Sequence, residues 1–385
     1  MVTIAALSCV FGVGMCFALL GSLGVKLMPR LGIDRGRFGT LVSALMMTSL
    51  FASLLMGMVT DKIGFKPVAV FGFLATAACI FFLGRSRTFG AAAACCIVLG
   101  LGAMALNTAG NTLIPMVLFG GANPAAASNL GNVFFGLGLF LTPLAVSFLF
   151  RKTSYEKSVA FLGLLILLPV VPALLASYPK AASGFVLSTA LSLVTNPVVI
   201  VGAAMLFLYS SIETSFCSWL PAYAKEIIGR GAAGGDENAV DARAQRMLSW
   251  FAIAMMAGRL VTSQIEGITR YGSWVICAVC AVAAAVILVM TRTGKPSSVP
   301  VMAALAGFLL APAFPTTVGL VFAKHPANFP SIFGIIFAGA MFGGSVVPKV
   351  IGNLSRGATI QKSLRLLIPI CLALALLAVL LGKLS

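Results

Sequence analysis

The feature that most constrains this chain is a series of apolar stretches, each about 20 residues long, separated by short polar segments. Wound as an α-helix, a stretch of this length crosses the roughly 30 Å hydrocarbon core of a bilayer. Helix is expected because backbone groups in lipid must form hydrogen bonds within their own segment. Of the 385 residues, 60% are hydrophobic and only 9% are charged, more apolar surface than a water-soluble fold can hide. We therefore expect an all-α, multi-pass membrane protein.

Twelve membrane spans are predicted from this pattern. They cover residues 4–27, 38–60, 66–84, 91–118, 126–150, 158–178, 197–224, 245–266, 273–290, 299–323, 330–353 and 364–382. No Lys or Arg precedes the first span, and no clear small-residue cleavage site accompanies it. We therefore expect this span to be retained rather than removed as a signal peptide.

The sequence also contains signs of an internal duplication. Leu27-Met28-Pro29 at the end of the first span matches Trp219-Leu220-Pro221 at the end of the seventh. Gly138 to Pro143 in the fifth span matches Gly343 to Pro348 in the eleventh, with the same spacing. Matches at equivalent places in two sets of six spans indicate a repeat.

Two related halves of six helices follow from this repeat. We predict an N-terminal half at residues 1–178 and a C-terminal half at 197–385, joined by a cytoplasmic linker at 179–196. Parallel six-helix repeats place a solute site near the middle of the membrane between the halves, where access alternates between the two sides. Gly-rich spans would let helices approach closely, although most such glycines serve packing alone.

Several residue types that would indicate an enzyme or a metalloprotein are poorly placed for it. All nine cysteines lie inside apolar stretches, where cysteine acts as a small buried hydrophobe. The single histidine, His325, has no second imidazole for a His-based metal site and lies in a loop. The net charge of +17 comes mostly from loops between spans, which fits membrane topology better than nucleic-acid binding. We expect no enzymatic activity, metal or cofactor, and a monomer in the lipid bilayer.

The loop after the second span carries the most specific motif. Its sequence, Gly57-Met58-Val59-Thr60-Asp61-Lys62-Ile63-Gly64-Phe65-Lys66-Pro67, resembles the signature loop of the major facilitator superfamily. Gly57 permits close helix approach, and Asp61 can accept hydrogen bonds from a neighbouring helix N-terminus. Gly64 allows a tight turn, while Lys62 and Lys66 favour an anionic leaflet. We assign these residues to gating and folding rather than to solute binding.

Within that superfamily, the chain resembles the fucose:proton symporter family across nearly all spans. The resemblance is carried by Gly100-Leu101-Gly102, Asn107-Thr108-Ala109-Gly110-Asn111, Tyr209-x-x-x-Glu213, Trp219-Leu220-x-x-Tyr223, Gly258-Arg259-Leu260, Pro312-Ala313-Phe314-Pro315-Thr316 and the Gly343-Gly344 to Pro348 run. It implies proton-driven uptake of a small polyol or sugar, with carboxylates in the first and fourth spans. This sequence departs from that pattern, because the two positions fall at Val25 and Asn107. Neither side chain can titrate as a carboxylic acid.

Two charged residues lie well inside predicted spans. A charge in the hydrocarbon costs about 2.5 to 3.5 kcal/mol on insertion scales, so Glu213 should face a cavity or a partner. We predict that Glu213 binds solute and couples transport to protons; the alternative is a structural carboxylate bonded to neighbours. Arg259, also a predicted solute ligand, needs a partner or a wet cavity, and pairing with Glu213 is possible. The alternative for Arg259 is snorkelling to the inner surface.

Uncharged polar and aromatic side chains complete the predicted solute site. Amides both donate and accept hydrogen bonds, as sugar hydroxyls require, and Tyr or Trp rings can stack on the apolar face of a sugar. The predicted ligands of this kind are Asn107, Asn111, Asn129, Asn132, Tyr209 and Trp219. Hydrogen bonding between helices is the alternative for the amides, and packing or interfacial placement is the alternative for the rings.

Uptake of a small polar solute, most simply a sugar or sugar-like compound, is the leading hypothesis, with protons as the coupling ion. Transport of an organic anion is the second hypothesis, motivated by the missing carboxylates together with Lys26, Arg259 and the basic loops. Export of a drug or metabolite is a third, because exporters share the signature loop.

The orientation predicted by the motif conflicts with the distribution of charge. A cytoplasmic signature loop puts both termini inside, as expected for a bacterial inner-membrane protein. Most Lys and Arg residues, among them Arg85, Arg87 and Lys157, then lie outside. The positive-inside rule favours the opposite orientation. We predict the orientation given by the motif, because it ties a fold-specific sequence to one side of the membrane.

Overall fold

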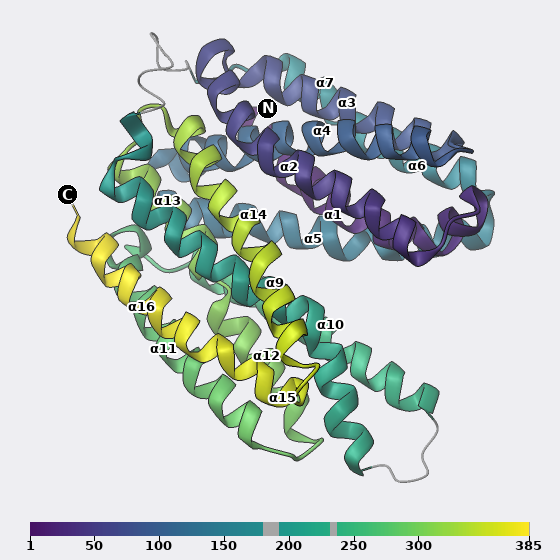
Figure 1. The fold of residues 1–385 in the computed structure, drawn as a ribbon. Helices are drawn as coiled ribbons and strands as arrows, with labels where there is room; N and C mark the ends of the chain where they lie inside the picture. Colours follow the sequence, from purple (N-terminus) through teal and green to yellow (C-terminus); the bar gives the residue numbers. More distant parts are fainter. Residues whose placement is uncertain (180–191, 232–236, 385) are drawn as a thin grey trace. The chain divides into compact units, whose positions relative to one another are not determined.

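The computed structural model of the protein describes residues 1–179, 192–231 and 237–384, and its helices are shown in Figure 1. Within these residues, the N-terminal part of the sequence contains the α-helices α1 (Val2–Leu31), α2 (Arg35–Ile63), α3 (Phe65–Arg85), α4 (Phe89–Val117), α5 (Pro124–Lys152), α6 (Tyr155–Leu167) and α7 (Val170–Leu175). The C-terminal part contributes α9 (Pro197–Gly231), α10 (Glu237–Ser263), α11 (Ile268–Arg292), α12 (Ser298–Leu310), α13 (Ala313–Lys324), α14 (Phe329–Leu354), α15 (Ile360–Ser363) and α16 (Leu367–Lys383).

Most of the predicted spans are present as helical segments that can cross a membrane. Within the described residues, eleven such segments are long and apolar enough, and they correspond to every predicted span except the eighth. The eighth span, predicted at 245–266, falls on α10, a helix of 27 residues. Arg246 and Arg259 lower the mean hydropathy of this segment, which explains why α10 falls short of the others.

Two predicted spans are interrupted at prolines. The span predicted at 158–178 is divided into α6 and α7 near Pro169, and the span predicted at 299–323 is divided into α12 and α13 near Pro312. Proline has no N–H to give to the preceding turn, and its ring clashes with the carbonyl four residues earlier. An apolar run alone does not reveal such breaks, because they do not change its hydropathy.

The described chain forms two compact units. Unit 1 contains Met1–Ala122, Gly131–Leu193 and His325–Ala338, and unit 2 contains Asn123–Leu130, Val194–Lys324 and Gly339–Ser385. Each unit therefore includes a short segment from the other half of the sequence, namely the beginning of α14 in unit 1 and the beginning of α5 in unit 2. The predicted linker at 179–196 lies largely outside the described residues, so the division of the halves at this linker stays a prediction.

Helix α4 lies at the centre of unit 1, packed against α1, α2 and α3, while α3 also packs against α6 (Figure 1). In unit 2, α10 packs against α9 and α12, and α11 packs against α16. Small residues make the α4 packing possible. A Cβ added to Gly102 would press on Thr76 of α3, and one added to Gly110 would press on Val10 of α1. The middle of α4 is consequently buried on all sides.

The duplicated glycines occupy equivalent helix crossings in the two units. A Cβ on Gly138 of α5 would overlap the carbonyl oxygen of Phe11 in α1, and a Cβ on Gly343 of α14 would overlap that of Phe207 in α9. Backbone therefore contacts backbone at both crossings, as small residues allow in membrane proteins. The matched Gly-to-Pro segments have the same packing role in each unit.

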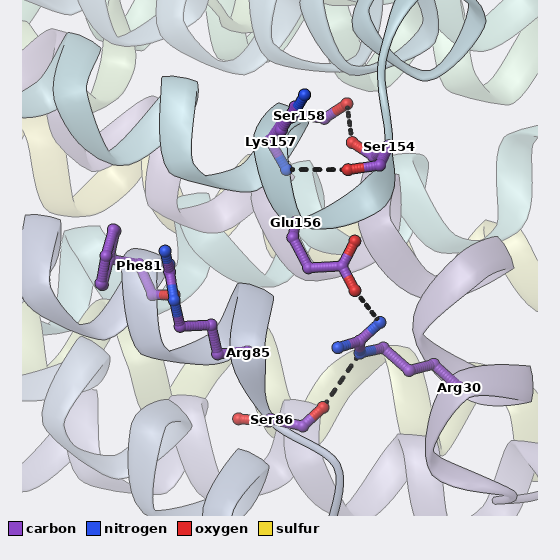
Figure 2. Close-up of polar contacts among 8 residues, drawn as sticks. All are labelled: Arg30, Phe81, Arg85, Ser86, Ser154, Glu156, Lys157 and Ser158. Carbon is purple, nitrogen blue, oxygen red and sulfur yellow. Dashed lines mark hydrogen bonds and ion pairs between the residues drawn. The ribbon is translucent and has the colours of Figure 1, made fainter.

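Polar contacts join the ends of three helices in unit 1. The guanidinium of Arg30, in the last turn of α1, donates from Nη1 to Glu156 Oε1 at 2.5 Å. Its Nε donates to the carbonyl oxygen of Ser86, just after α3, at 3.1 Å. Figure 2 shows Arg30 between these two partners. Arg30 thus links the end of α1 to the end of α3 and the beginning of α6.

The equivalent helix ends in unit 2 are joined by different residues. Glu226 of α9 accepts a hydrogen bond from the backbone N–H of Ile360, the first residue of α15, at 2.9 Å. Arg365 donates from Nη2 to the carbonyl oxygen of Thr291 in the last turn of α11 at 3.1 Å. Helix-end contacts thus occur at corresponding places in the two units, although the first helix provides the guanidinium in unit 1 and the carboxylate in unit 2.

Candidate functional site

A buried polar cluster lies between α9 and α10 in unit 2. Tyr209 and Glu213 are one turn apart on α9, and Arg259 reaches both from α10. Arg259 Nη2 lies 3.0 Å from the Tyr209 hydroxyl and 3.2 Å from Glu213 Oε1. The ring of Phe314 in α13 lies beside Tyr209, with 5.7 Å between the ring centroids. Helix positions four residues apart share a face, so α9 presents both partners to a single guanidinium.

The break between α12 and α13 supplies a further acceptor for Arg259. In a continuous helix the carbonyl of Ala311 would bond to the N–H of residue 315, but Pro315 has none. Arg259 Nε lies 3.4 Å from this carbonyl oxygen. Gly258 permits the approach, because a Cβ there would meet the backbone of Phe308 in α12. Gly258 and Pro315 thus both favour the contact between Arg259 and the Ala311 carbonyl.

Arg259 is buried rather than snorkelling. Its side chain is 4% exposed and that of Glu213 is 27% exposed. The predicted pairing of these residues is therefore present in the structure, and the snorkelling alternative is not supported. A buried guanidinium needs charge compensation and hydrogen bonds, and the carboxylate, the phenol and the Ala311 carbonyl provide them. Glu213 is the member of the cluster that remains partly accessible.

The two amides of α4 form a second polar group, in unit 1. Asn111 Nδ2 donates to Asn107 Oδ1 at 2.9 Å and to the Asn107 carbonyl oxygen at 3.1 Å. Both residues are buried, with 3% and 6% of their surface exposed. Four-residue spacing places the amides on one face of α4. The Val25 side chain, at the other position where the resemblance implies a carboxylate, lies outside the described part of the chain.

The other two predicted amides are on α5. Asn129, in unit 2, donates from Nδ2 to Thr316 Oγ1 of α13 at 2.8 Å and to the Ala125 carbonyl oxygen at 2.9 Å. It is completely buried, so its contacts favour hydrogen bonding between helices. Asn132, in unit 1, is also buried. The structure thus assigns these neighbouring amides to different units.

The two predicted aromatic ligands are held by protein contacts. Trp219 donates from Nε1 to the carbonyl oxygen of Pro348 in α14 at 2.9 Å, and its ring lies against Gly352. Tyr209 is 1% exposed, and its hydroxyl also lies 3.7 Å from the sulfur of Met255. These contacts favour packing for Trp219. They make Tyr209 part of the Arg259 cluster rather than an exposed stacking surface.

The signature loop contacts the beginning of α14 within unit 1. Asp61 is 3% exposed, and its Oδ2 accepts a hydrogen bond from the backbone N–H of Ser331 at 2.9 Å. A Cβ on Gly57 would overlap the backbone of Pro330. The hydrogen bond that a helix N-terminus donates to Asp61, as expected from the sequence, is thus present, and the helix dipole favours it. Its role in gating stays a prediction.

The remaining loop residues agree with the turn expected from the motif. Gly64 lies between α2 and α3 with φ 88° and ψ 171°, a conformation that favours glycine. Lys62 and Lys66 are exposed beside it. Across the described ranges, no three His, Cys, Asp or Glu side chains gather closely enough to hold a metal ion.

Similarity to known proteins agrees with this geometry. A family model described as the Major Facilitator Superfamily matches residues 6–348. The chain belongs to the Major Facilitator Superfamily. Members of this superfamily are membrane transporters, which confirms the predictions of a multi-pass transporter and of a non-enzymatic function. No curated protein sequence matches the chain significantly.

Solved structures show the same fold for this Major Facilitator Superfamily member. The E. coli fucose:proton symporter FucP, as an alanine variant, matches with a TM-score of 0.78 at 17% identity, covering 100% of this chain and 99% of FucP. FucP in the outward conformation matches with the same TM-score and identity, covering 100% of both chains. This likeness confirms the all-helical major facilitator fold and the structural resemblance to the fucose:proton symporter.

Some contacts of the site were not predicted from the sequence. In the sequence, the Pro-Ala-Phe-Pro-Thr motif indicates only a family resemblance, yet in the structure Phe314 contacts Tyr209 and Thr316 accepts a hydrogen bond from Asn129. The Ala311 carbonyl, which contacts Arg259, could have been found from the proline four residues later. The partners of the motif's side chains, Tyr209 and Asn129, could not have been predicted from the sequence, because they lie on helices that are distant along the chain.

Proposed function

We propose that this transporter takes up a small polar solute, a sugar or sugar-like compound, by alternating access coupled to protons. The observation that carries the proposal is a partly exposed carboxylate, Glu213, bonded to a buried guanidinium inside the spans of unit 2. Ionisable groups at such depth are costly and usually serve a pathway or a relay. Because the chain belongs to a transporter superfamily, a role in transport explains why such costly residues lie inside the membrane.

Uncharged hydrogen-bonding groups support a sugar as the solute. Asn107 and Asn111 place two amides on one face of the buried middle of α4. Each amide both donates and accepts, so a hydroxyl-rich solute could replace the bond between them. The fold likeness to a protein described as a fucose:proton symporter adds support by analogy alone.

Protonation of Glu213 is the proposed coupling step. The ionised carboxylate attracts Arg259, and protonation removes that attraction while leaving Arg259 its contacts with Tyr209 and the Ala311 carbonyl. The neutral carboxyl could then donate a hydrogen bond. Glu213 replaces, in this proposal, the carboxylates that the fucose:proton symporter resemblance implies at Val25 and Asn107.

Replacement of Glu213 by glutamine separates coupling from transport. The amide keeps the size and an acceptor oxygen for Arg259 but cannot titrate. In proteoliposomes, E213Q is expected to lose accumulation driven by a pH gradient and to retain exchange of preloaded solute. E226Q, at the end of the same helix, is the control and should accumulate solute like the unmodified chain. Accumulation by E213Q at the unmodified level would exclude Glu213 as the coupling residue.

The organic-anion alternative receives less support from the described contacts. Arg259 already has a carboxylate partner, and the Lys26 ammonium lies 4.2 Å from the centroid of the Phe150 ring. If anions are nevertheless the solute, R259Q should weaken anion binding more than the binding of neutral sugars. No described contact favours drug or metabolite export over these functions.

We further propose that the signature loop is cytoplasmic, with both termini on that side of a bacterial inner membrane. Asp61 and Gly57 would then hold the beginning of α14 at the cytoplasmic surface, and release of this contact would accompany gating. The motif supports this orientation, against the distribution of Lys and Arg.

Cysteine labelling of intact cells tests the orientation. Gly90, at the beginning of α4, and Lys66, in the signature loop, are both exposed and belong to unit 1. A membrane-impermeant maleimide is expected to label G90C from outside and to label K66C only after the cells are opened. The unmodified chain provides the background from its own cysteines. The reverse labelling pattern would invert the orientation.

A further inference from the structure

One end of unit 1 concentrates positive charge. The segments 26–37, 85–87 and 151–157 contain nine Lys or Arg residues and only two Asp or Glu residues. The hydrogen bonds of Arg30 to Ser86 and Glu156 bring the ends of these three segments together (Figure 2). Gly84 also lies against Val159, so the end of α3 contacts the first turns of α6. The charge is therefore gathered at one place and not scattered over the loops.

The two acidic residues of these segments are occupied locally. Glu156 is paired with Arg30. Asp34 is the N-cap of α2 and accepts a hydrogen bond from the backbone N–H of Arg37 at 2.7 Å. The basic residues that the structure shows as exposed in these segments form what we call the basic surface, consisting of Arg37, Arg85, Arg87, Arg151, Lys152 and Lys157. Such a surface attracts anions electrostatically.

Exposed aromatic rings adjoin the basic surface. The Arg85 guanidinium carbon lies 3.6 Å from the centroid of the Phe81 ring, one turn earlier on α3. Figure 2 shows the two side chains next to each other. Phe81 and Phe82 are 39% and 60% exposed, although both lie in a span. Phe148 on α5 and Phe161 on α6 are also exposed. Exposed rings inside spans face acyl chains. The basic surface and the rings therefore lie next to each other in the same order as the headgroup and the acyl chains of a phospholipid.

We propose that the basic surface binds the headgroup of an anionic phospholipid, whose acyl chains lie against Phe81 and Phe82. A small inorganic anion would use only the charged part of this arrangement, whereas a phospholipid uses both parts. The proposal concerns unit 1 alone and does not depend on the transported solute. It also gives the basic residues of the predicted outer loops a partner, whichever side of the membrane they occupy.

Lipid titration of the full-length chain in detergent tests the proposal. Phosphatidylglycerol is expected to bind, by native mass spectrometry, more tightly than phosphatidylcholine with the same acyl chains. R85Q/R87Q/K157Q should weaken phosphatidylglycerol binding more than tenfold, because each basic residue near an anionic membrane surface contributes about fivefold. R292Q/K295Q/R356Q removes three exposed charges from unit 2 and is the matched control, expected to bind like the unmodified chain.

Two further measurements keep the test decisive if the triple variant folds poorly. Phosphatidylglycerol binding to the unmodified chain should weaken as salt is raised, because exposed charges are screened. F81A should weaken phosphatidylglycerol binding while leaving the response to inorganic phosphate unchanged. Equal binding of both lipids, equal stabilisation by inorganic phosphate, or an equal loss in the control variant would overturn the proposal. Failure of solute transport would not affect it.

Discussion

Replacing Arg259 by glutamine is expected to destabilise the folded chain by about 3 kcal/mol, the lower end of the range for removing one partner of a buried ion pair. The expected loss is at the lower end because the Glu213 side chain is 27% exposed and is therefore not fully enclosed by protein. The remaining carboxylate loses its counter-charge, and the Tyr209 hydroxyl and Ala311 carbonyl lose a donor. The midpoint of thermal unfolding in detergent measures the effect.

The double variant E213Q/R259Q shows whether the loss comes from an uncompensated charge. Removal of both charges should recover part of the stability, because no isolated carboxylate remains. R292Q removes one positive charge, as R259Q does, but from an exposed position. This variant should unfold like the original chain. If R259Q matches R292Q in its unfolding midpoint, the buried pair does not stabilise unit 2.

Leucine at Gly138 or Gly343 is expected to prevent folding of the unit that contains it. Even a Cβ at these positions overlaps a carbonyl oxygen of the facing helix, and that oxygen cannot move without moving the helix. Overpacking by one or two methyl groups costs about 1 to 3 kcal/mol, and a whole leucine side chain at a backbone crossing exceeds that range. The yield of monodisperse protein after detergent extraction is the measurement.

Glycines without neighbours provide the control for this prediction. Gly21 in α1 and Gly39 in α2 have no atom within 4 Å of an added Cβ. Leucine at either position should leave the yield unchanged or raise it slightly, because glycine weakens a helix interior. Equal yields for G343L and G21L would mean that α9 and α14 do not pack through their backbones.

The fold could be predicted from the sequence because lipid restricts the choices. Apolar length gives the spans, and the repeat and the signature loop indicate the superfamily. Helix breaks escaped prediction because hydropathy does not register the missing N–H of Pro312. The placement of α5 residues such as Asn129 in unit 2 also escaped it, because sequence order alone assigned them to the N-terminal half.

The candidate site was predicted in part for a related reason. The cost of burying charge identified Glu213 and Arg259 as residues that need partners, and their pairing followed from that need. The sequence alone does not decide the roles of the amide and aromatic residues, because the same side chains serve both solute binding and helix packing. Only the partners distinguish these roles. Trp219, for example, donates to a carbonyl on α14, a helix more than a hundred residues later in the sequence.

The contact of Trp219 with α14 also has a consequence for spectroscopy. The chain contains three tryptophans, and two of them, Trp250 and Trp274, are 52% and 63% exposed. The indole of Trp219, in contrast, is hydrogen-bonded to the Pro348 carbonyl and rests on Gly352. Brominated lipids would quench the two exposed indoles more strongly than Trp219, which is only partly exposed. The protein thus carries an intrinsic fluorophore that reports the separation of α9 and α14 without any attached dye.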